Sequence, residues 1–280
     1  MKLVFFGTPD FAVPALQSLT NSPHQILSVV TNPDKKSGRG LKINYSPVKQ
    51  ACCKLGHEVI QPDNLIDKDF LNHLKQINPE IYVVVAFKIL PEILLNIPPY
   101  GAINLHASLL PKYRGAAPIN HAILNGEKET GLTTFQLKKK ADTGNILQQK
   151  SIPIPSSATT GDIYCQLADL GGEILIKTLD GIENGSLLSR PQDEKLATAA
   201  PKISSNDILI ALDIEGFEVS TGSACSSGKI EPSRTLGAMG LSDSILKSAV
   251  RVSLGPYNTY EEAKIFAKAV SKIKKRFLHT

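Results

Sequence analysis

The chain has 280 residues, of which 42% are hydrophobic and 20% charged, and its formal net charge is +5 at pH 7. These values are ordinary for a folded globular protein and exclude a collagen-like or low-complexity chain. A chain of this length can bury one large core or two smaller ones. The basic excess favours polyanionic partners only weakly, because the charge could be spread over the whole surface.

The N-terminus and the cysteines indicate a cellular setting. The apolar run from Leu3 to Phe6 is too short for a signal peptide or a membrane span, and it is typical of a buried strand. Cys52 and Cys53 are adjacent while the other two cysteines stand alone, so no pair has zinc-ligand or redox spacing. We therefore predict a reduced, cytoplasmic protein without a metal and without a membrane partner.

Short apolar runs rich in β-branched residues alternate with helical patterns along the first half of the chain. The predicted strands are Leu3 to Gly7, Ile26 to Thr31, Ile81 to Phe87 and Ala102 to His106. Such alternation predicts an α/β fold with a Rossmann-like, mostly parallel sheet. Helix starts are expected at Ser46, which precedes Pro47, and at Asp10, with Pro14 in the first turn.

The turn after the first strand limits the choice of ligand. Its sequence, Gly7-Thr8-Pro9-Asp10, lacks the three spaced glycines that bring a backbone close to a pyrophosphate, so a nicotinamide cofactor is not expected. No stretch matches the phosphate-binding pattern GxxxxGK[ST] either. Ligands of parallel sheets usually bind at the carboxyl ends of the strands, so a ligand site is expected at that edge of the predicted sheet.

The last third of the chain has a different pattern. Residues 185–205 are polar, contain Pro and Ala, and lack an amphipathic period, so we predict a linker between a domain of residues 1–184 and a tail of residues 206–280. The tail is predicted to be a small α/β unit. Its expected elements are helices at 208–214 and from 259 to about 276, and strands at 217–220 and 250–254.

The strongest chemical pattern lies at the end of the fourth predicted strand, Ala102 to His106. Successive side chains of a strand alternate between faces, so Asn104 and His106 point to one side while Ile103 and Leu105 point into the packing. An amide and an imidazole are thus presented together at a strand end. Taken alone, the same residues are also compatible with a loop-tethering Asn and a hydrogen-bonded buried His.

This strand end, followed by Ser108-Leu109-Leu110-Pro111 and by Asp142 within Ala-Asp-Thr-Gly, resembles the formyltransferases that use 10-formyltetrahydrofolate. The resemblance runs from about Lys2 to Ile203. Several further motifs are similar to the methionyl-tRNA branch of that family: Gly7 to Phe11, Pro33-Asp34, Gly38-Arg39-Gly40, Ser46 to Lys49 and Arg114 to Ile119.

The resemblance implies roles for individual residues. Asn104 and His106 would donate to the oxygen of a tetrahedral intermediate, and Asp142 would orient His106 and help to deprotonate the attacking amine. No metal is implied. The folate would be bordered by the segment Ser108, Leu109, Leu110 and Pro111. The run Val83 to Phe87, with Val85 and Phe87, would form an apolar wall for the pterin, although a core strand is the favoured interpretation of that run.

A basic segment from Asp34 to Lys54 is the candidate contact for initiator methionyl-tRNA. The predicted tRNA-binding residues are Lys35, Lys36, Arg39 and Lys42, and the glycines at 38 and 40 favour a flexible loop that could follow phosphates. A solvated charged loop is the alternative. Lys138, Lys139 and Lys140 form a second basic run for which an exposed hairpin is the simpler interpretation. We expect a monomer.

From about Asp207 to Phe277 the chain is similar to the C-terminal segment of cysteine desulfurases. The similarity rests on Ser220 to Gly228, Glu231 to Ser233 and Val250 to Gly255. In that family the position of Cys225 carries a persulfide, and the position of Arg251 binds a carboxylate. No His-Lys dipeptide that could hold pyridoxal phosphate occurs in the chain, so neither that cofactor nor desulfurase activity is expected.

Several hypotheses about function stay open at this point. The chain is either a working, truncated formyltransferase or a non-catalytic chimera of two truncated genes, since one resemblance stops near Ile203 and the other begins near Ser205. A formyltransferase that acts on another amine is a further possibility, and a bifunctional tRNA-modifying protein ranks last.

Overall fold

The computed structural model describes residues 1–37, 42–203, 208, 212–213, 216–219, 236, 238–239 and 249–276. The chain divides into two compact units, Met1–Ala200 and Pro201–Thr280. Each unit is described below by itself. Within the described residues, none of the helices is both long enough and apolar enough to span a membrane.

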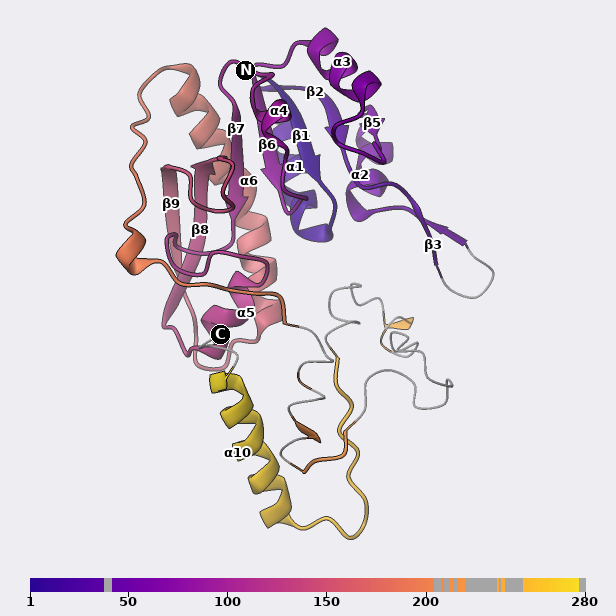
Figure 1. Cartoon of the computed structure of the whole chain (residues 1–280), viewed down its shortest axis with the longest axis vertical. Helices are drawn as coiled ribbons and strands as arrows, with labels where there is room; N and C mark the ends of the chain where they lie inside the picture. The colour runs from indigo at the N-terminus through magenta and orange to yellow at the C-terminus, as the bar shows by residue number, and fades with distance from the viewer. Residues whose placement is uncertain are drawn as a thin grey trace. The chain divides into compact units, whose positions relative to one another are not determined.

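The first unit is built on a seven-stranded sheet (Figure 1). The strand order is β5-β2-β1-β6-β7-β8-β9, and the bounds are β1 (Lys2–Gly7), β2 (Gln25–Val30), β5 (Val59–Ile60), β6 (Ile81–Val85), β7 (Ala102–His106), β8 (Glu129–Gln136) and β9 (Ile146–Pro153). The pairings from β5 to β7 are parallel, and β8 and β9 continue the sheet antiparallel. The predicted α/β fold with a mostly parallel sheet is confirmed.

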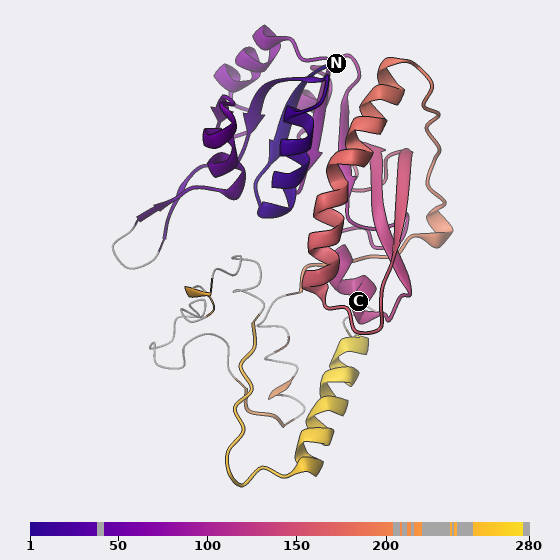
Figure 2. The same ribbon diagram turned by 180° about the vertical axis from the view of Figure 1, so that it is seen from behind.

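Helices cover both faces of this sheet. The helices of the unit are η1 (Asp10–Ala12), α1 (Val13–Thr20), α2 (Pro47–Leu55), α3 (Lys68–Ile77), α4 (Glu92–Leu95), α5 (Pro118–Leu124), α6 (Thr160–Glu183) and η2 (Glu194–Leu196). Helices α1, α2 and α6 share a core cluster with Leu3 and Phe5, whereas α3 and α4 share a second cluster with Val4 and Phe6. Figure 2 shows α1 and α6 side by side on the first of these faces. Alternate residues of each central strand therefore enter different cores.

The four strands predicted for the first unit agree with β1, β2, β6 and β7 to within two residues. The fourth predicted strand coincides with β7, whereas β6 ends at Val85 instead of Phe87. The early end has a local cause, since Ala86 adopts a left-handed backbone conformation with φ of 48° that a strand cannot continue through.

One of the two predicted helix starts is correct. The Ser46 side chain accepts a hydrogen bond from the backbone N–H of Lys49 at 3.1 Å, and Pro47 occupies the first helical position of α2. The prediction for Asp10 holds in part: the helical stretch begins there as η1 and continues directly into α1, with Pro14 in the first turn of α1, but Asp10 caps neither helix. Asp10 instead accepts a hydrogen bond from the hydroxyl of Tyr164 in α6, at 2.6 Å.

The basic segment Asp34 to Lys54 is not one flexible loop. Strands β3 (Lys35–Ser37) and β4 (Lys42–Asn44) pair antiparallel and extend away from the main sheet, and α2 follows them (Figure 1). Lys49 is committed within the unit, because its ammonium group pairs with Asp34 and lies 4.3 Å from the centre of the Tyr45 ring. Lys35, Lys36 and Lys42 of this segment thus belong to the hairpin of β3 and β4, whereas Lys54 is exposed on α2.

Residues 185–200, which we name the strap, belong to the first unit, although the sequence predicts a linker from residue 185. Arg190 bridges Ile146 at the edge of the sheet, and Ala199 bridges Arg114. Ala200 is fully buried against Tyr113 and Ala122. A polar segment without a helical period can still be well anchored when its backbone groups find partners, as they do here.

The described part of the second unit is dominated by α10 (Tyr260–Arg276), close to the predicted final helix. Its Phe266 stacks edge-to-face on Phe217, with ring centres 5.2 Å apart. The predicted strands are not found where the chain is described: residues 217–219 are irregular, Ser220 lies outside the described residues, and residues 250–254 contain a single bridge residue, Arg251. Of the predicted helix at 208–214, residues 208, 212 and 213 are described, and all three are helical.

The strap leads to a prediction about truncation. A fragment ending at Ile203 should unfold cooperatively, whereas one ending at Asn184 should lose at least about 3 kcal/mol of unfolding free energy. Each lost hydrogen bond from the strap to the backbone N–H of Tyr113, Arg114 and Ala117 contributes on the order of 1 kcal/mol. Urea unfolding followed by circular dichroism measures the difference. Equal stability of the two fragments would show that the strap is a linker after all.

Candidate active site

Strand β7 presents Asn104 and His106 at the carboxyl edge of the parallel strands. His106 is 7% exposed and Asn104 is half-buried, while Ile103 and Leu105 lie in the core cluster that contains α1 and α6. The two polar residues pair with Phe135 and Thr133 of β8. The predicted alternation along the strand therefore holds, with both polar side chains away from that core.

A hydrogen bond fixes the orientation of the His106 ring. Its Nε2 lies 2.8 Å from the backbone oxygen of Tyr113. A carbonyl oxygen only accepts, so Nε2 must carry a proton and the other nitrogen, Nδ1, is left for a different partner. Tyr113 itself has a left-handed backbone with φ of 62°, and burial together with a hydrogen bond to Glu127 raises the pKa of its hydroxyl to about 12.

The segment predicted to border the folate is a tightly held loop. Ser108 is fully buried, and its hydroxyl donates to the backbone oxygen of Lys112 at 2.6 Å. Thr133 donates to the oxygen of Ser108 at 2.6 Å and accepts from the N–H of Leu110 at 3.1 Å. Leu110 is buried and precedes Pro111 through a cis peptide bond, whereas Leu109 is half-buried. The loop therefore offers mainly backbone and apolar surface.

Thr133 is an organising residue that the sequence reasoning missed. It is fully buried, and besides the two loop contacts it accepts a hydrogen bond from the Gln149 side chain at 3.0 Å. The available signal was weak, because only the antiparallel register of β8 against β7 places this hydroxyl opposite His106.

Asp142 lies in the loop between β8 and β9, half-buried and with a left-handed backbone of φ 53°. Its Oδ2 accepts a hydrogen bond from the backbone N–H of Gly115 at 2.9 Å. Both Asp142 and His106 are described, and no hydrogen bond or ion pair joins them. The arrangement ties Asp142 to the segment after Tyr113 instead of to the imidazole.

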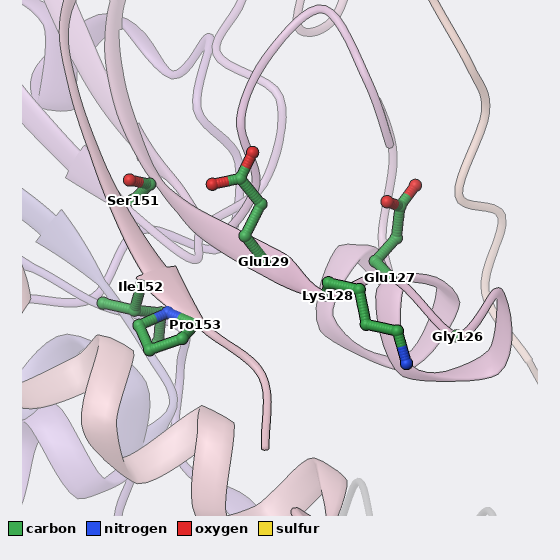
Figure 3. A pocket seen from close by; sticks show the side chains of 7 residues that line it. All are labelled: Gly126, Glu127, Lys128, Glu129, Ser151, Ile152 and Pro153. Carbon is green, nitrogen blue, oxygen red and sulfur yellow. The ribbon is translucent and has the colours of Figure 1, made fainter. Parts of the chain in front are cut away.

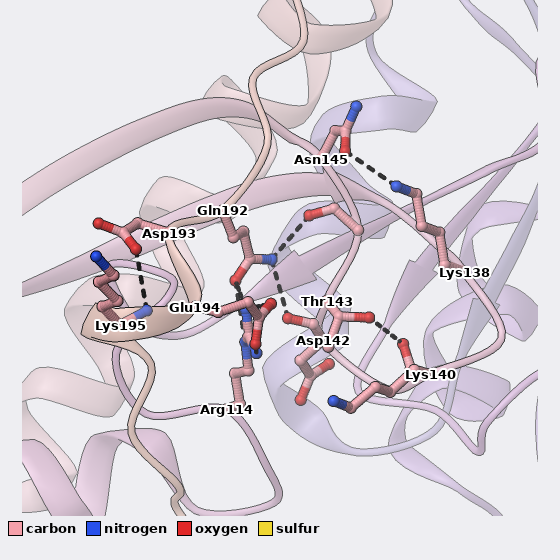
Figure 4. A network of polar contacts seen from close by, with 11 residues as sticks. Arg114, Lys138, Lys140, Asp142, Thr143, Asn145, Gln192, Asp193, Glu194 and Lys195 are labelled. Carbon is pink, nitrogen blue, oxygen red and sulfur yellow. Dashed lines mark hydrogen bonds and ion pairs between the residues drawn. The ribbon is translucent and has the colours of Figure 1, made fainter.

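A polar network surrounds Asp142 (Figure 4). The Gln192 amide donates to the backbone oxygens of Asp142 and Gly144, at 2.9 and 2.7 Å. Its oxygen accepts from Nε and Nη2 of Arg114, at 3.0 and 2.7 Å. Arg114 also pairs with Glu194 at 2.9 Å, and that contact lowers the pKa of the Glu194 carboxyl. The sequence reasoning noted Arg114 only as a family motif and assigned no role to Gln192 or Glu194.

The two residues predicted as an apolar wall occupy different environments. Val85 is fully buried in the core cluster with α1 and α6, so its side chain faces packing. Phe87 is half-buried and stacks edge-to-face on Phe6, with ring centres 5.6 Å apart. Of the two, Phe87 retains the exposed surface that a ligand could contact.

The predicted tRNA residues lie on the hairpin that follows β2. Lys35 and Lys36 are in β3 and pair with Asn44 and Ile43, and Lys42 is in β4. Arg39 lies outside the described residues. Among the residues predicted to be desulfurase-like, Cys225 is also outside them, and Arg251 is exposed in the second unit.

Two other features lie apart from these residues. A shallow pocket is lined by Gly126 to Glu129 and Ser151 to Pro153, and it contains none of the predicted site residues (Figure 3). Among the described residues, His24, Asp180 and Glu183 form the one group with metal-ligand spacing, but Glu183 there pairs with the N-terminal amine at 2.9 Å. His24 immediately precedes β2, so this group is at the amino edge of the sheet, opposite His106.

Comparison with family models assigns both parts of the chain. The formyl transferase family model matches residues 1–179, which contain Asn104, His106 and Asp142. The aminotransferase class-V model matches residues 166–266, a range that reaches from α6 into the second unit. The second match bears out the resemblance of the tail to cysteine desulfurases at the level of that family.

Individual relatives refine the first assignment. The chain is 50% identical over 205 residues to the methionyl-tRNA formyltransferase of Caldanaerobacter subterraneus subsp. tengcongensis, covering 72% of this chain and 66% of the relative. It is 46% identical over 223 residues to that of Porphyromonas gingivalis, covering 78% and 69%. The chain thus spans about two thirds of the length of the curated relatives it matches.

Solved structures agree on the fold. A Helicobacter canadensis N-formyltransferase in complex with folinic acid and dTDP-3-aminofucose has a TM-score of 0.58 at 21% identity, over 80% of this chain and 77% of that one. Glycinamide ribonucleotide transformylase 1 of Symbiobacterium toebii has a TM-score of 0.56 at 16% identity, over 69% and 94%. The family match over residues 1–179 shows that the chain is a formyl transferase. Within that class the chain belongs to the methionyl-tRNA formyltransferase family.

The role of Thr133 leads to a second prediction. Thr133→Val keeps the side-chain shape but leaves the buried N–H of Leu110 and the oxygen of Ser108 without their hydrogen-bond partner. The free energy of unfolding should therefore fall by roughly 1–3 kcal/mol. Thr130→Val in the same strand is the matched control, because the buried Thr130 hydroxyl has no hydrogen-bond partner among the described residues and its loss should be neutral or stabilising. Denaturant titration measures both. Equal effects would contradict the role given to Thr133.

Proposed function

We propose that the chain transfers a formyl group from 10-formyltetrahydrofolate to the amino group of initiator methionyl-tRNA. The observation that carries the proposal is the 46–50% identity to methionyl-tRNA formyltransferases, together with a family match whose range includes Asn104, His106 and Asp142. Folate as donor is supported by a further solved structure with a similar fold, a sugar 3N-formyl transferase that was crystallised in the presence of dTDP and 5-N-formyl-THF. A reaction of translation initiation belongs to the cytoplasm.

The chemistry requires fixed donors at one point. The methionine amine attacks the formyl carbon on N10 of the folate, and negative charge develops on the oxygen of the tetrahedral intermediate. Collapse of the intermediate breaks the bond from the formyl carbon to N10, and tetrahydrofolate leaves with a proton that balances the one lost by the amine. The Asn104 amide, half-buried at the end of β7, is suited to donate to that oxygen. One such preorganised donor contributes a factor of roughly 10² to 10³ to the rate.

His106 can serve as the second donor only in one protonation state. Its Nε2–H is already committed to the oxygen of Tyr113, so a donor toward the intermediate must come from Nδ1. Nδ1 carries a proton only when the ring is the imidazolium cation. The positive charge then adds electrostatic stabilisation of the developing oxyanion to the hydrogen bond.

Asp142 completes the proposed set as the residue whose negative charge stabilises the imidazolium cation and which accepts the amine proton, directly or through water. Its carboxylate has one oxygen held by the N–H of Gly115, and the other is left for such a role. In the absence of substrate, catalytic contacts are often long and tighten only in the reacting complex. No metal takes part in this scheme.

The β3–β4 hairpin is the proposed contact for tRNA phosphates. It leaves the sheet after the carboxyl end of β2, which is the same edge at which β7 presents His106. Lys35, Lys36, Arg39 and Lys42 give it a positive charge without an acidic residue among residues 35–44. Phosphate contacts position a nucleic acid and make its binding sensitive to salt.

We assign the catalytic role to the first unit. The tail from residue 206 is proposed to be a desulfurase-like remnant, with Cys225 and Arg251 at the matching positions and without desulfurase activity. A monomer suffices for the reaction, because all proposed catalytic residues come from one unit.

The catalytic assignment predicts the outcome of three substitutions. Asn104→Ala and His106→Ala should each lower kcat by roughly 10²- to 10³-fold, because each removes one donor to the oxyanion. Asp142→Ala should lower it by roughly 10²- to 10⁴-fold through loss of acid–base catalysis. The measurement is formylation of Met-tRNA by the purified chain with 10-formyltetrahydrofolate.

The control for Asp142→Ala is Asp69→Ala, which should keep full activity. Asp69 is an exposed residue of α3 and lies outside the proposed site. A folded parent chain that forms no product would identify a non-catalytic chimera. Formylation of an amino-sugar nucleotide but not of Met-tRNA would identify a different acceptor. Full activity in all three variants would refute the assignment of the catalytic site to Asn104, His106 and Asp142.

The hairpin assignment predicts a change in salt dependence. Replacing Lys35, Lys36 and Lys42 by Ala should raise the KM for Met-tRNA and flatten its dependence on log[salt] by roughly 0.7–0.9 per lost phosphate contact, with the KM for folate unchanged. Lys68→Ala, Lys75→Ala and Lys177→Ala combined, at exposed positions of α3 and α6, form the charge-matched control. An unchanged salt slope in the hairpin variant would place the tRNA elsewhere.

A further inference from the structure

We propose that Gln192 is a positioning residue that holds the loop of Asp142 in its working geometry. The inference rests on the proposed function, since it takes Asp142 to be the residue that acts on the amine. It concerns a residue beyond the 1–179 range of the family match, in the strap that the sequence presents as a linker. Three observations support it: the contacts of Gln192, the conformation of the loop, and the packing of Gly115.

Gln192 uses every polar group of its side chain to connect two loops. Its amide nitrogen donates one hydrogen bond to the oxygen of Asp142 and another to the oxygen of Gly144. Its amide oxygen receives two hydrogen bonds from the guanidinium of Arg114. A glutamine is suited to this place because it supplies two donors and a two-fold acceptor on one rigid plane (Figure 4).

The loop that Gln192 holds would not adopt its conformation without support. Asp142 has φ of 53°, in the left-handed region that residues with a Cβ atom rarely occupy. Gly144 is packed so closely that an added Cβ would lie 1.5 Å from the backbone oxygen of Gln136. The two carbonyl groups that Gln192 binds therefore belong to the two constrained residues of the loop.

Gly115 connects the same strap to the Asp142 side chain. Its N–H donates to Oδ2 of Asp142, and a Cβ at this position would lie 2.5 Å from the backbone oxygen of Ala200. The strap supports Gly115 from both sides, because Arg114 N–H donates to Thr198 at 2.8 Å and Ala117 N–H donates to Ala200 at 3.1 Å. Backbone and carboxylate of Asp142 are thus both fixed through residues 192–200.

The consequence for this chain is specific. The positioning device ends at Ala200, before the point near Ile203 where the resemblance to formyltransferases stops. The change of family along the chain therefore leaves the support of the catalytic loop complete. Truncation of the strap, or substitution of Gln192 within it, should impair catalysis, although the strap itself contributes no reacting group.

Two substitutions separate the contact to Asp142 from the contact to Arg114. Gln192→Ala removes both. Gln192→Glu keeps an acceptor for the Arg114 guanidinium but places a carboxylate oxygen where two backbone oxygens now receive hydrogen bonds, at 2.9 and 2.7 Å. If Gln192 acts through the Asp142 loop, both variants are impaired. If it serves only to fasten the strap to Arg114, Gln192→Glu behaves like the parent chain.

The experiment uses the full chain and two readouts. Steady-state formylation of Met-tRNA should show kcat lowered roughly 10- to 100-fold in both variants, with the KM values for folate and Met-tRNA unchanged. The reason is that the Asp142 carboxylate would shift away from the position in which it acts on the amine, while the binding surfaces stay in place. Amide hydrogen exchange by NMR should show the Gly115 amide exchanging at least about tenfold faster, since its acceptor has moved. The amides of Arg114 and Ala117, which bond the strap, should be unaffected in Gln192→Glu.

Lys195→Ala is the matched control, an exposed position of the same strap that should change neither readout. Unchanged Gly115 exchange in Gln192→Glu overturns the positioning role, whatever the activity. Faster exchange at Gly115 together with an inactive parent chain supports the positioning role and refutes the proposed function, so the two failures are distinguishable. A raised KM with unchanged kcat also overturns the role, because it would assign Gln192 to binding.

Discussion

The burial of both faces of the parallel strands is the constraint on which the rest of this molecule depends. Residues of β1, β6 and β7 alternate between two cores, one shared with α1, α2 and α6 and the other with α3 and α4. Strands that are buried on both faces leave polar side chains without access to a ligand or to solvent along most of their length. Such side chains collect at the carboxyl ends, where Asn104 and His106 complete β7 and where the basic hairpin leaves β2.

The polar edge depends in turn on groups that take no part in the chemistry. The Tyr113 carbonyl selects which nitrogen of His106 is protonated, and the hydroxyl of Thr133 holds the loop that follows. Gln192 holds the loop of Asp142 from the other side. A set of catalytic residues is useful only when such partners hold it still, because loose geometry forfeits most of the rate advantage.

Because the strap packs on the first unit, that unit extends to Ala200, shortly before the resemblance to one family ends near Ile203. The residues of the strap are polar and irregular, yet they complete the first unit by pairing with the segment from Tyr113 to Ala117 and by burying Ala200. The formyltransferase part therefore closes on itself before the second unit begins. The proposed catalytic residues and the groups that hold them thus all lie within residues 1–200.

The sequence by itself determined the strands β1, β2, β6 and β7, the helix cap at Ser46 and the paired Asn104 and His106, because these follow from local periodicity, hydrogen-bond chemistry and alternation along one strand. Tertiary structure alone decided the rest. Thr133 meets the loop of Ser108 through the register of β8, and Gln192 reaches Asp142 across a separation of 50 residues. The strap looks like a linker in sequence because its stability comes from backbone partners far away in the chain, which no local pattern of side chains can reveal.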